Sequence, residues 1–266
     1  MKTFCRTVTG GYAALCILCL ANNAGAADLV SPVTPDLKPV VTEQGWTFSA
    51  APYFWAAGLS GNVGQFGLPS VEVDSNFGDI LKNLDFAAMA VIEARYDRYS
   101  IFGDLQYVKI SAGNGTPKGI LADSVDLTSQ TFSGLGGAGY SVLQSDAGRL
   151  DVVGAMRVWS VDTELDFHGG ILDGRSASDG KTWVDGLVGI RANYSLTPEV
   201  YVTGWGMVGA GAANIDWDVA ATLGYRFNDR FSAVVGYRAL GVNYDNDGFV
   251  FDVVQQGPIM GLIMRF

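Results

Sequence analysis

The residues best able to do chemistry in this sequence are arginines that recur on the polar side of segments in which apolar and polar residues alternate. They are Arg95, Arg157, Arg191, Arg226, Arg238 and Arg265, with Glu93, Asp104, Asp185 and Asp218 as possible partners. Arginines that pair with these acids would fill and close an interior. Unpaired arginines would instead line a constriction that favours anions. Whether the interior is closed or forms a constriction depends on the elements that position these residues.

A single histidine limits the enzymatic chemistry open to the chain. His168 lies within Asp166-Phe167-His168, at the head of a segment that we expect to be a long loop. A hydrolase that uses Ser, His and an acid would need this histidine, and nothing in the sequence places a serine beside it. We therefore interpret His168 as a solvated loop residue and expect no enzyme activity.

Metal and thiol chemistry find little support. Asp245-Asn246-Asp247-Gly248 resembles the first half of an EF-hand calcium loop, but the glutamate that closes such a loop is absent, and these residue types favour a plain turn. The three cysteines are Cys5, Cys16 and Cys19. All of them fall in a segment that we expect to be removed, so the mature chain would have no thiol for a disulfide or a zinc site. We expect no metal and no cofactor.

The N-terminal segment is typical of a secretory signal peptide. Lys2 and Arg6 precede an apolar run over 12–21, and Ala24-Gly25-Ala26 offers a small-residue cleavage site. We predict a signal peptide over 1–26 and a proline-containing, poorly ordered periplasmic lead-in over 27–45. One domain then covers 46–266.

The rest of the chain is acidic and yet hydrophobic. Once Lys2 and Arg6 are removed from the 17 basic residues, 15 remain against 27 acidic ones, a formal charge of −12. Such a chain repels phosphate, so we expect no nucleic-acid partner. Hydrophobic residues make up 48% of the sequence, but the mature part has no uninterrupted apolar run of 18 residues. Its hydrophobicity therefore needs an explanation other than a membrane-spanning helix.

From Trp46 onward, apolar and polar residues alternate with a period of two, as in membrane-spanning β-strands. In 85–96 the even positions include Phe86 and Ile92, and the odd positions include Glu93 and Arg95. The same division recurs in 184–195 and 216–227. An arginine facing lipid at mid-depth would cost about 2–4 kcal/mol, so the shared phase of the arginines itself supports an interior face.

The turns divide into two classes. Short turns lie at 96–99, 145–148, 197–199 and 228–230, and long segments rich in Gly or Asp lie at 61–83, 112–124 and 168–181. Outer-membrane barrels have short turns in the periplasm and long loops outside. Eight or twelve strands remain alternatives to ten, because 213–215 is short where an outer loop is expected. We predict a transmembrane antiparallel β-barrel with ten strands at 46–60, 84–96, 99–111, 125–143, 149–163, 182–195, 199–213, 216–227, 230–244 and 250–266.

Two further features belong to this barrel. Apolar residues within 77–84 predict a short amphipathic helix that packs on the outer rim. Aromatic residues at strand ends predict girdles at the lipid headgroup level. The girdle residues are Trp46, Tyr96, Tyr99, Tyr194, Tyr201, Trp217, Tyr225, Phe227, Phe231 and Phe266.

Both ends of the chain resemble bacterial outer-membrane barrel proteins. The sequence from Gly261 to Phe266 is similar to the family's assembly signal, with a terminal aromatic residue, apolar residues such as Met264 at alternate positions, and a glycine five residues upstream. Ile259 departs from the polar residue that is usual two positions before the glycine. The resemblance implies recognition by the barrel-assembly machinery. The run 46–55 followed by Gly58-Leu59-Ser60-Gly61 is also similar to uncharacterised proteobacterial barrels.

One enzyme family deserves comparison. The pair formed by Asp166 and His168 resembles a feature of the omptin proteases, which are ten-stranded barrels with a second aspartate pair across the mouth. No comparable second pair stands out here. The resemblance does not extend to a protease site.

We therefore expect a non-enzymatic outer-membrane barrel of structural or surface-interaction type, whose charged residues fill a narrow lumen. The expected partners are outer-membrane lipid, lipopolysaccharide and the barrel-assembly machinery. The alternative is a small passive channel for anionic or small polar solutes. The sequence leaves the oligomeric state open.

Overall fold

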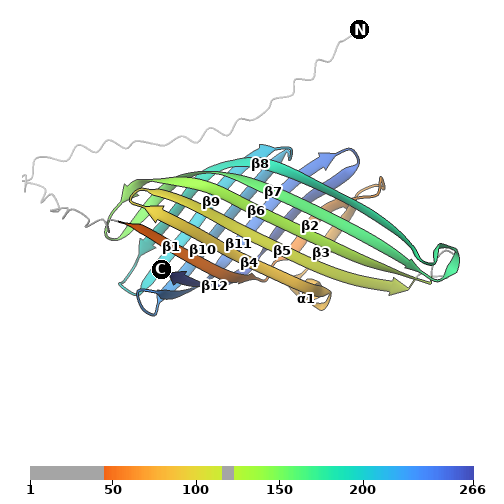
Figure 1. Ribbon diagram of the computed structural model, residues 1–266, viewed down its shortest axis with the longest axis horizontal. Coiled ribbons are helices and arrows are strands. Elements are labelled where there is room, and N and C mark those ends of the chain that lie inside the picture. The colour runs from red at the N-terminus through yellow and green to blue at the C-terminus, as the bar shows by residue number, and fades with distance from the viewer. Residues whose placement is uncertain (1–44, 116–122) are drawn as a thin grey trace, which may run out of the picture. The chain divides into compact units, whose positions relative to one another are not determined.

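A computed structural model describes residues 45–115 and 123–266 (Figure 1). The predicted signal peptide and nearly all of the predicted lead-in lie outside these residues. No helix in the described part of the chain is long and apolar enough to cross a membrane. The strands are β1 (Trp46–Trp55), β2 (Gly58–Gly64), β3 (Val71–Ser75), β4 (Leu84–Tyr96), β5 (Tyr99–Gly115), β6 (Ser124–Gln144), β7 (Gly148–His168), β8 (Arg175–Ser195), β9 (Val200–Gly211), β10 (Ile215–Arg226), β11 (Phe231–Asn246) and β12 (Phe249–Arg265).

The strands form one antiparallel sheet that closes on itself. From β4 to β12 each strand pairs with the next, and β1 pairs with both β4 and β12. β2 continues along β12, and β3 pairs with β2, so ten strands close the ring and these two are additional. The prediction of ten strands is confirmed, and the alternatives of eight and twelve are wrong.

The first predicted strand is interrupted at Ala56 and Ala57. β1 follows β12 as far as Trp55 opposite Ile259, and β2 resumes with Gly58 opposite Gln256. Pro258 lies opposite the interruption, and its carbonyl accepts the N–H of Ala56 at 2.8 Å. Proline has no N–H for a strand ladder, so it is tolerated where the neighbouring strand breaks.

Several strands extend beyond their predicted limits. β7 ends at His168 and β8 begins at Arg175, so the expected long loop over 168–181 is wrong. The two strands instead form a hairpin that projects at one end of the barrel, closed by a single 3₁₀ turn at Gly170–Leu172 (Figure 1). The sequence hides this extension because polar residues such as Thr163 and Glu164 occupy both faces there, so the alternation ends before the strands do.

The outer surface of the barrel is apolar, with the predicted phase. Ile92, Val188 and Leu223 point outward and are 53%, 66% and 49% exposed. A closed sheet satisfies its backbone hydrogen bonds internally, and an apolar exterior then suits contact with lipid tails. The fold therefore has the two properties that a membrane-spanning barrel requires.

Most of the predicted girdle residues lie on the outside, but Tyr201 does not. Its side chain is 1% exposed inside the barrel, where its hydroxyl donates to Ser232 at 3.1 Å and its ring occupies the space beside Gly224. The prediction for Tyr201 is wrong because a position near a strand end does not decide the face. The exposed girdle residues are Trp46, Tyr96, Tyr99, Tyr194, Tyr225, Phe227, Phe231 and Phe266, and Trp217 is partly covered.

The predicted short helix is α1 (Phe77–Lys82). Asn76 caps it by accepting the N–H of Asp79 at 3.1 Å. Phe77 packs edge-on against the outward-facing Phe54, with ring centroids 5.6 Å apart. The short helix is confirmed, and it packs against the outer wall of the barrel at Phe54.

Candidate functional site

The centre of the lumen holds a network of buried charges around Asp218. This carboxylate accepts from Arg157 and Arg238, each at 2.6 Å, and from the indole N–H of Trp205 at 2.8 Å. Arg157 and Asp218 are 0% exposed and Arg238 is 1% exposed. The side chains come from β7, β10 and β11, where the alternation turns each of them inward.

The network continues from wall to wall. Arg238 also donates to Asp104 on β5 at 2.7 Å, and the hydroxyl of Tyr53 donates to the same carboxylate at 2.7 Å. β5 and β11 lie on opposite sides of the ring, so this ion pair spans the lumen. At the other end of the network Arg157 donates to Asp216 at 2.5 Å. A charge can be buried without a large penalty only when it is paired in this way.

Asp185 does not take an arginine as its partner, contrary to the expectation from the sequence. It lies opposite Arg157 in the β7–β8 register, but that guanidinium reaches across the lumen instead. Asp185 accepts the backbone N–H of Ala213 at 2.8 Å. The carboxylate thereby holds the connection between β9 and β10.

A layer of aromatic rings lies next to the network, toward the end of the barrel with the β7–β8 hairpin. Trp183 stacks on Tyr244 and Trp159, with centroids 4.2 Å and 6.0 Å away. The Trp159 indole N–H donates to Asp216 at 2.9 Å, which joins the layer to the charges. Trp159 and Phe249 are each 1% exposed. The charges and the rings at this level are therefore buried and bonded to one another.

A second cluster of charges lies nearer the short turns. Glu93 accepts from Arg191 at 2.7 Å, Arg95 at 3.2 Å and Arg149 at 3.4 Å. Arg95 also pairs with Asp151 at 2.5 Å. Sequence reasoning did not single out Arg149, Asp151 or Asp216. The same alternation could have found them, since Asp151 lies on the face of β7 that carries Arg157.

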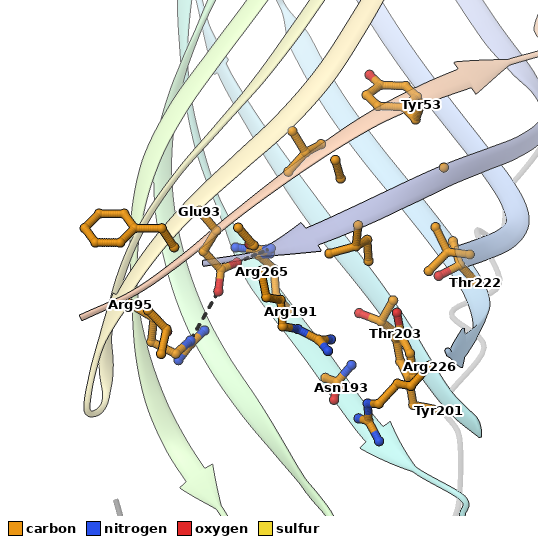
Figure 2. A pocket seen from close by; sticks show the side chains of 18 of the residues that line it. Tyr53, Glu93, Arg95, Arg191, Asn193, Tyr201, Thr203, Thr222, Arg226 and Arg265 are labelled. Atoms are coloured by element: carbon orange, nitrogen blue, oxygen red, sulfur yellow. Dashed lines mark hydrogen bonds and ion pairs between the residues drawn. The ribbon is translucent and has the colours of Figure 1, made fainter. Parts of the chain in front are cut away.

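This cluster forms part of the lining of a cavity of about 570 Å³ at the end of the barrel that has the short turns (Figure 2). Six arginines line it: Arg95, Arg149, Arg191, Arg226, Arg230 and Arg265. Figure 2 shows Arg191, Asn193 and Arg226 along one wall, and Tyr53 at a distance from the strand ends. We call this cavity the arginine vestibule.

Arg226 is held in place by neutral groups. It donates to the carbonyl of Pro198 at 2.8 Å and to the hydroxyl of Ser195 at 3.0 Å, and it lies 4.6 Å above the ring of Tyr201. Within 45–115 and 123–266, no carboxylate lies within ion-pair distance of Arg226 or Arg265. These two predicted lumen residues therefore differ from Arg157 and Arg238, which are paired.

The remaining candidates lie away from the lumen. His168 contacts Asp126 at 3.0 Å on the exposed β6–β7 rim, with both side chains more than half exposed. Asp247 and Gly248 form the two-residue connection between β11 and β12, with φ of 53° and 79°, as expected of a turn. Among the described residues, no group of three or more potential ligand side chains could hold a metal ion.

The C-terminal assembly signal lies in the last strand. Gly261 pairs with Tyr53 and Met264 with Ala50, and the N–H of Phe266 donates to Phe48 at 2.9 Å. This segment forms the seam that closes the barrel. Its recognition by the assembly machinery stays a prediction.

The sequence matches no protein-family model and no curated protein. Solved structures of other proteins align with this chain. The outer-membrane protease OmpT from Escherichia coli aligns with a TM-score of 0.56 at 8% identity, over 86% of this chain and 100% of that one. Ail, the attachment invasion locus protein of Yersinia pestis, aligns with a TM-score of 0.36 at 12% identity, over 84% and 99%. The likeness to OmpT, at 8% identity, concerns the fold.

The closed ring of ten strands, its apolar exterior and this likeness define the class of the protein. It is a closed antiparallel β-barrel of ten strands with an apolar exterior, a fold that OmpT shares.

Proposed function

We propose that this protein is a sealed outer-membrane barrel of structural or surface-interaction type. The observation that carries the proposal is the buried ion-pair network from Asp104 through Arg238 and Asp218 to Arg157, in which Asp104 is 8% exposed and the other three residues are at most 1% exposed. The aromatic layer supports it from one side. An open channel would need a continuous wet path through both layers.

The bonding of the network supports a closed lumen. Opening a path would separate Arg238 from Asp104 and Asp218, and the bonds that Tyr53 and Trp205 make to the same carboxylates would be disturbed as well.

The surface that such a barrel displays is acidic. The extended β7–β8 hairpin exposes Asp162, Glu164 and Asp173. A basic or cation-bridged partner suits this surface, which includes lipopolysaccharide through divalent cations. Contact with the barrel-assembly machinery through the C-terminal strand belongs to the same proposal.

No enzymatic role is part of the proposal. His168 has only Asp126 as a side-chain partner in the described residues, and both groups stand on the exposed rim. OmpT is named as a protease, but a likeness at 8% identity carries the fold and not the chemistry.

The test is the conductance of the refolded mature chain in planar lipid bilayers, with a salt gradient to read ion preference. We expect no discrete current steps from protein that resists SDS until it is heated, because the network and the rings leave no wet path. A known porin in the same bilayer checks the sensitivity of the assay. Reproducible steps of one size from the folded parent would overturn the sealed barrel.

The second candidate is a small passive channel for anionic solutes, which the arginine vestibule favours because it resembles the mouth of an anion-selective pore. That candidate predicts steps with anion preference. It also predicts that replacing Arg157 and Arg238 by glutamine weakens the preference. A sealed barrel would only lose stability on the same replacement.

A further inference from the structure

We propose that the arginine vestibule binds an organic anion with an apolar body, which enters from the periplasmic side. The vestibule adjoins the short turns, and these face the periplasm in barrels of this class. Whether or not the barrel conducts, this site stands on its own lining and can be tested separately.

The lining has an excess of positive charge. The side chains that line the cavity include six arginines and two carboxylates, those of Glu93 and Asp229. Glu93 is already shared by three of the arginines, and Asp151 behind them takes a second bond from Arg95. The field inside the vestibule therefore attracts an anion.

Two of the arginines, Arg226 and Arg265, have no carboxylate partner among the described residues and can therefore bind a ligand anion. Arg226 is fixed by the Pro198 carbonyl, the Ser195 hydroxyl and the ring of Tyr201, none of which neutralises its charge. A guanidinium has five N–H donors, so further donors remain for a carboxylate, phosphate or sulfonate oxygen. Arg265, on the last strand, adds a second charge to the same cavity.

The deeper part of the vestibule is apolar. Val91, Trp205 and Ile259 line it together with the ring of Tyr53, and they lie further from the short turns than Arg226 and Arg265 do along their strands. A bare inorganic ion would leave this surface unused. A ligand with an apolar body can cover it while its charged group stays among the arginines.

The size of the cavity fits a small molecule. Its volume of about 570 Å³ falls in the range of roughly 300–1,000 Å³ that is usual for ligand pockets. At its inner end the cavity meets Tyr53, whose hydroxyl is bonded to Arg238 and Asp104. Shape, charge and depth together define an amphipathic anion as the ligand class.

The test uses the mature chain in lipid nanodiscs, which leave both ends of the barrel accessible, and isothermal titration calorimetry with naphthalene-2-sulfonate as the probe. We expect saturable binding of one probe per barrel that weakens as salt is raised. Neutral 2-naphthol tests the contribution of the apolar lining without a charge, and inorganic phosphate tests the contribution of the arginines without an apolar body. Each should bind at least tenfold more weakly than the probe.

Replacing Arg226 and Arg265 by glutamine should weaken probe binding about tenfold, because two charge-assisted contacts are lost. Neither arginine has a carboxylate partner among the described residues, so the fold should be kept. The matched control is the Arg98→Gln/Arg175→Gln variant. It removes the same amount of charge, and neither residue lines the cavity.

Three outcomes would overturn the proposal. The first is a parent protein that does not bind the probe, and the second is equal affinity in the parent and the Arg226→Gln/Arg265→Gln variant. The third is phosphate binding that is as tight as binding of the probe, since the apolar part of the vestibule would then contribute nothing to affinity. None of these results depends on the conductance experiment, so the site and the sealed lumen can fail independently.

Discussion

Asp218 joins two arginines and an indole through one carboxylate in the middle of the barrel. Its value to the fold is that it compensates two buried positive charges at once. A buried ion pair contributes little compared with apolar packing, but the loss of one member leaves its partners uncompensated.

Asp218→Asn keeps the shape of the side chain and removes its charge. We expect this variant to lower the free energy of unfolding by about 3–5 kcal/mol, because Arg157 and Arg238 lose their shared counter-charge. Urea unfolding in lipid vesicles, followed by tryptophan fluorescence, measures the change. Asp229→Asn, in an exposed turn, is the control. Equal unfolding midpoints for Asp218→Asn and the parent would show that the network is dispensable.

The inward direction of the arginines could be predicted from the sequence, but their partners could not. Alternation assigns a face to each residue and predicts that Arg157 and Asp185 both point inward. The stagger of the strands then decides which inward groups meet across the lumen, and Arg157 meets Asp216 and Asp218 on β10. The vestibule depends on the same stagger, so its volume was also beyond the reach of the sequence.

At the scale of the strands, closure depends on the place where β1 and β2 separate. Gly257 lies opposite that interruption, and a Cβ added there would meet the backbone of Ala56 and Ala57. The indole of Trp55 also donates to the carbonyl of Gly257, at 3.2 Å. The sequence predicted one continuous strand here, because a break in strand pairing leaves no mark on the alternation.

Gly257→Val should therefore impair closure of the barrel. We expect a fall in the fraction of refolded protein that migrates as the compact, heat-modifiable form in SDS gels, since the side chain collides with backbone that cannot move aside. Gly154→Ala is the control, because an added Cβ at Gly154 meets nothing within 4 Å. Normal folding yield for Gly257→Val would contradict the close approach of the strands.

At the scale of the whole molecule, the division between a lipid-facing outside and a packed inside was available from the sequence. The assignment of each residue to the outside or the inside follows from the alternation of apolar and polar residues along a strand. It does not require any distance between strands. The tryptophans test it directly. Trp46 is 53% exposed on the outer surface, whereas Trp159 and Trp183 are 1% and 3% exposed in the lumen.

Variants that retain a single tryptophan can be compared by the quenching of their fluorescence in vesicles of brominated lipid. We expect strong quenching of Trp46 fluorescence by the lipid bromines and little quenching of Trp159, which is shielded by the barrel wall. Vesicles without bromine give the reference intensity. Equal quenching at the two positions would mean that the assigned faces are wrong.

The projecting hairpin between β7 and β8 can transmit a mechanical force to the barrel wall. β6, β7 and β8 are each 21 residues long. At about 3.3 Å per residue and a tilt of roughly 40°, each strand rises about 50 Å, against an apolar band of about 25 Å. The hairpin is then a cantilever anchored in the wall, with its tip roughly 20 Å beyond the edge of the apolar band. A load on that tip passes along hydrogen-bonded strands straight into the barrel, so anything that grips it pulls on the whole wall.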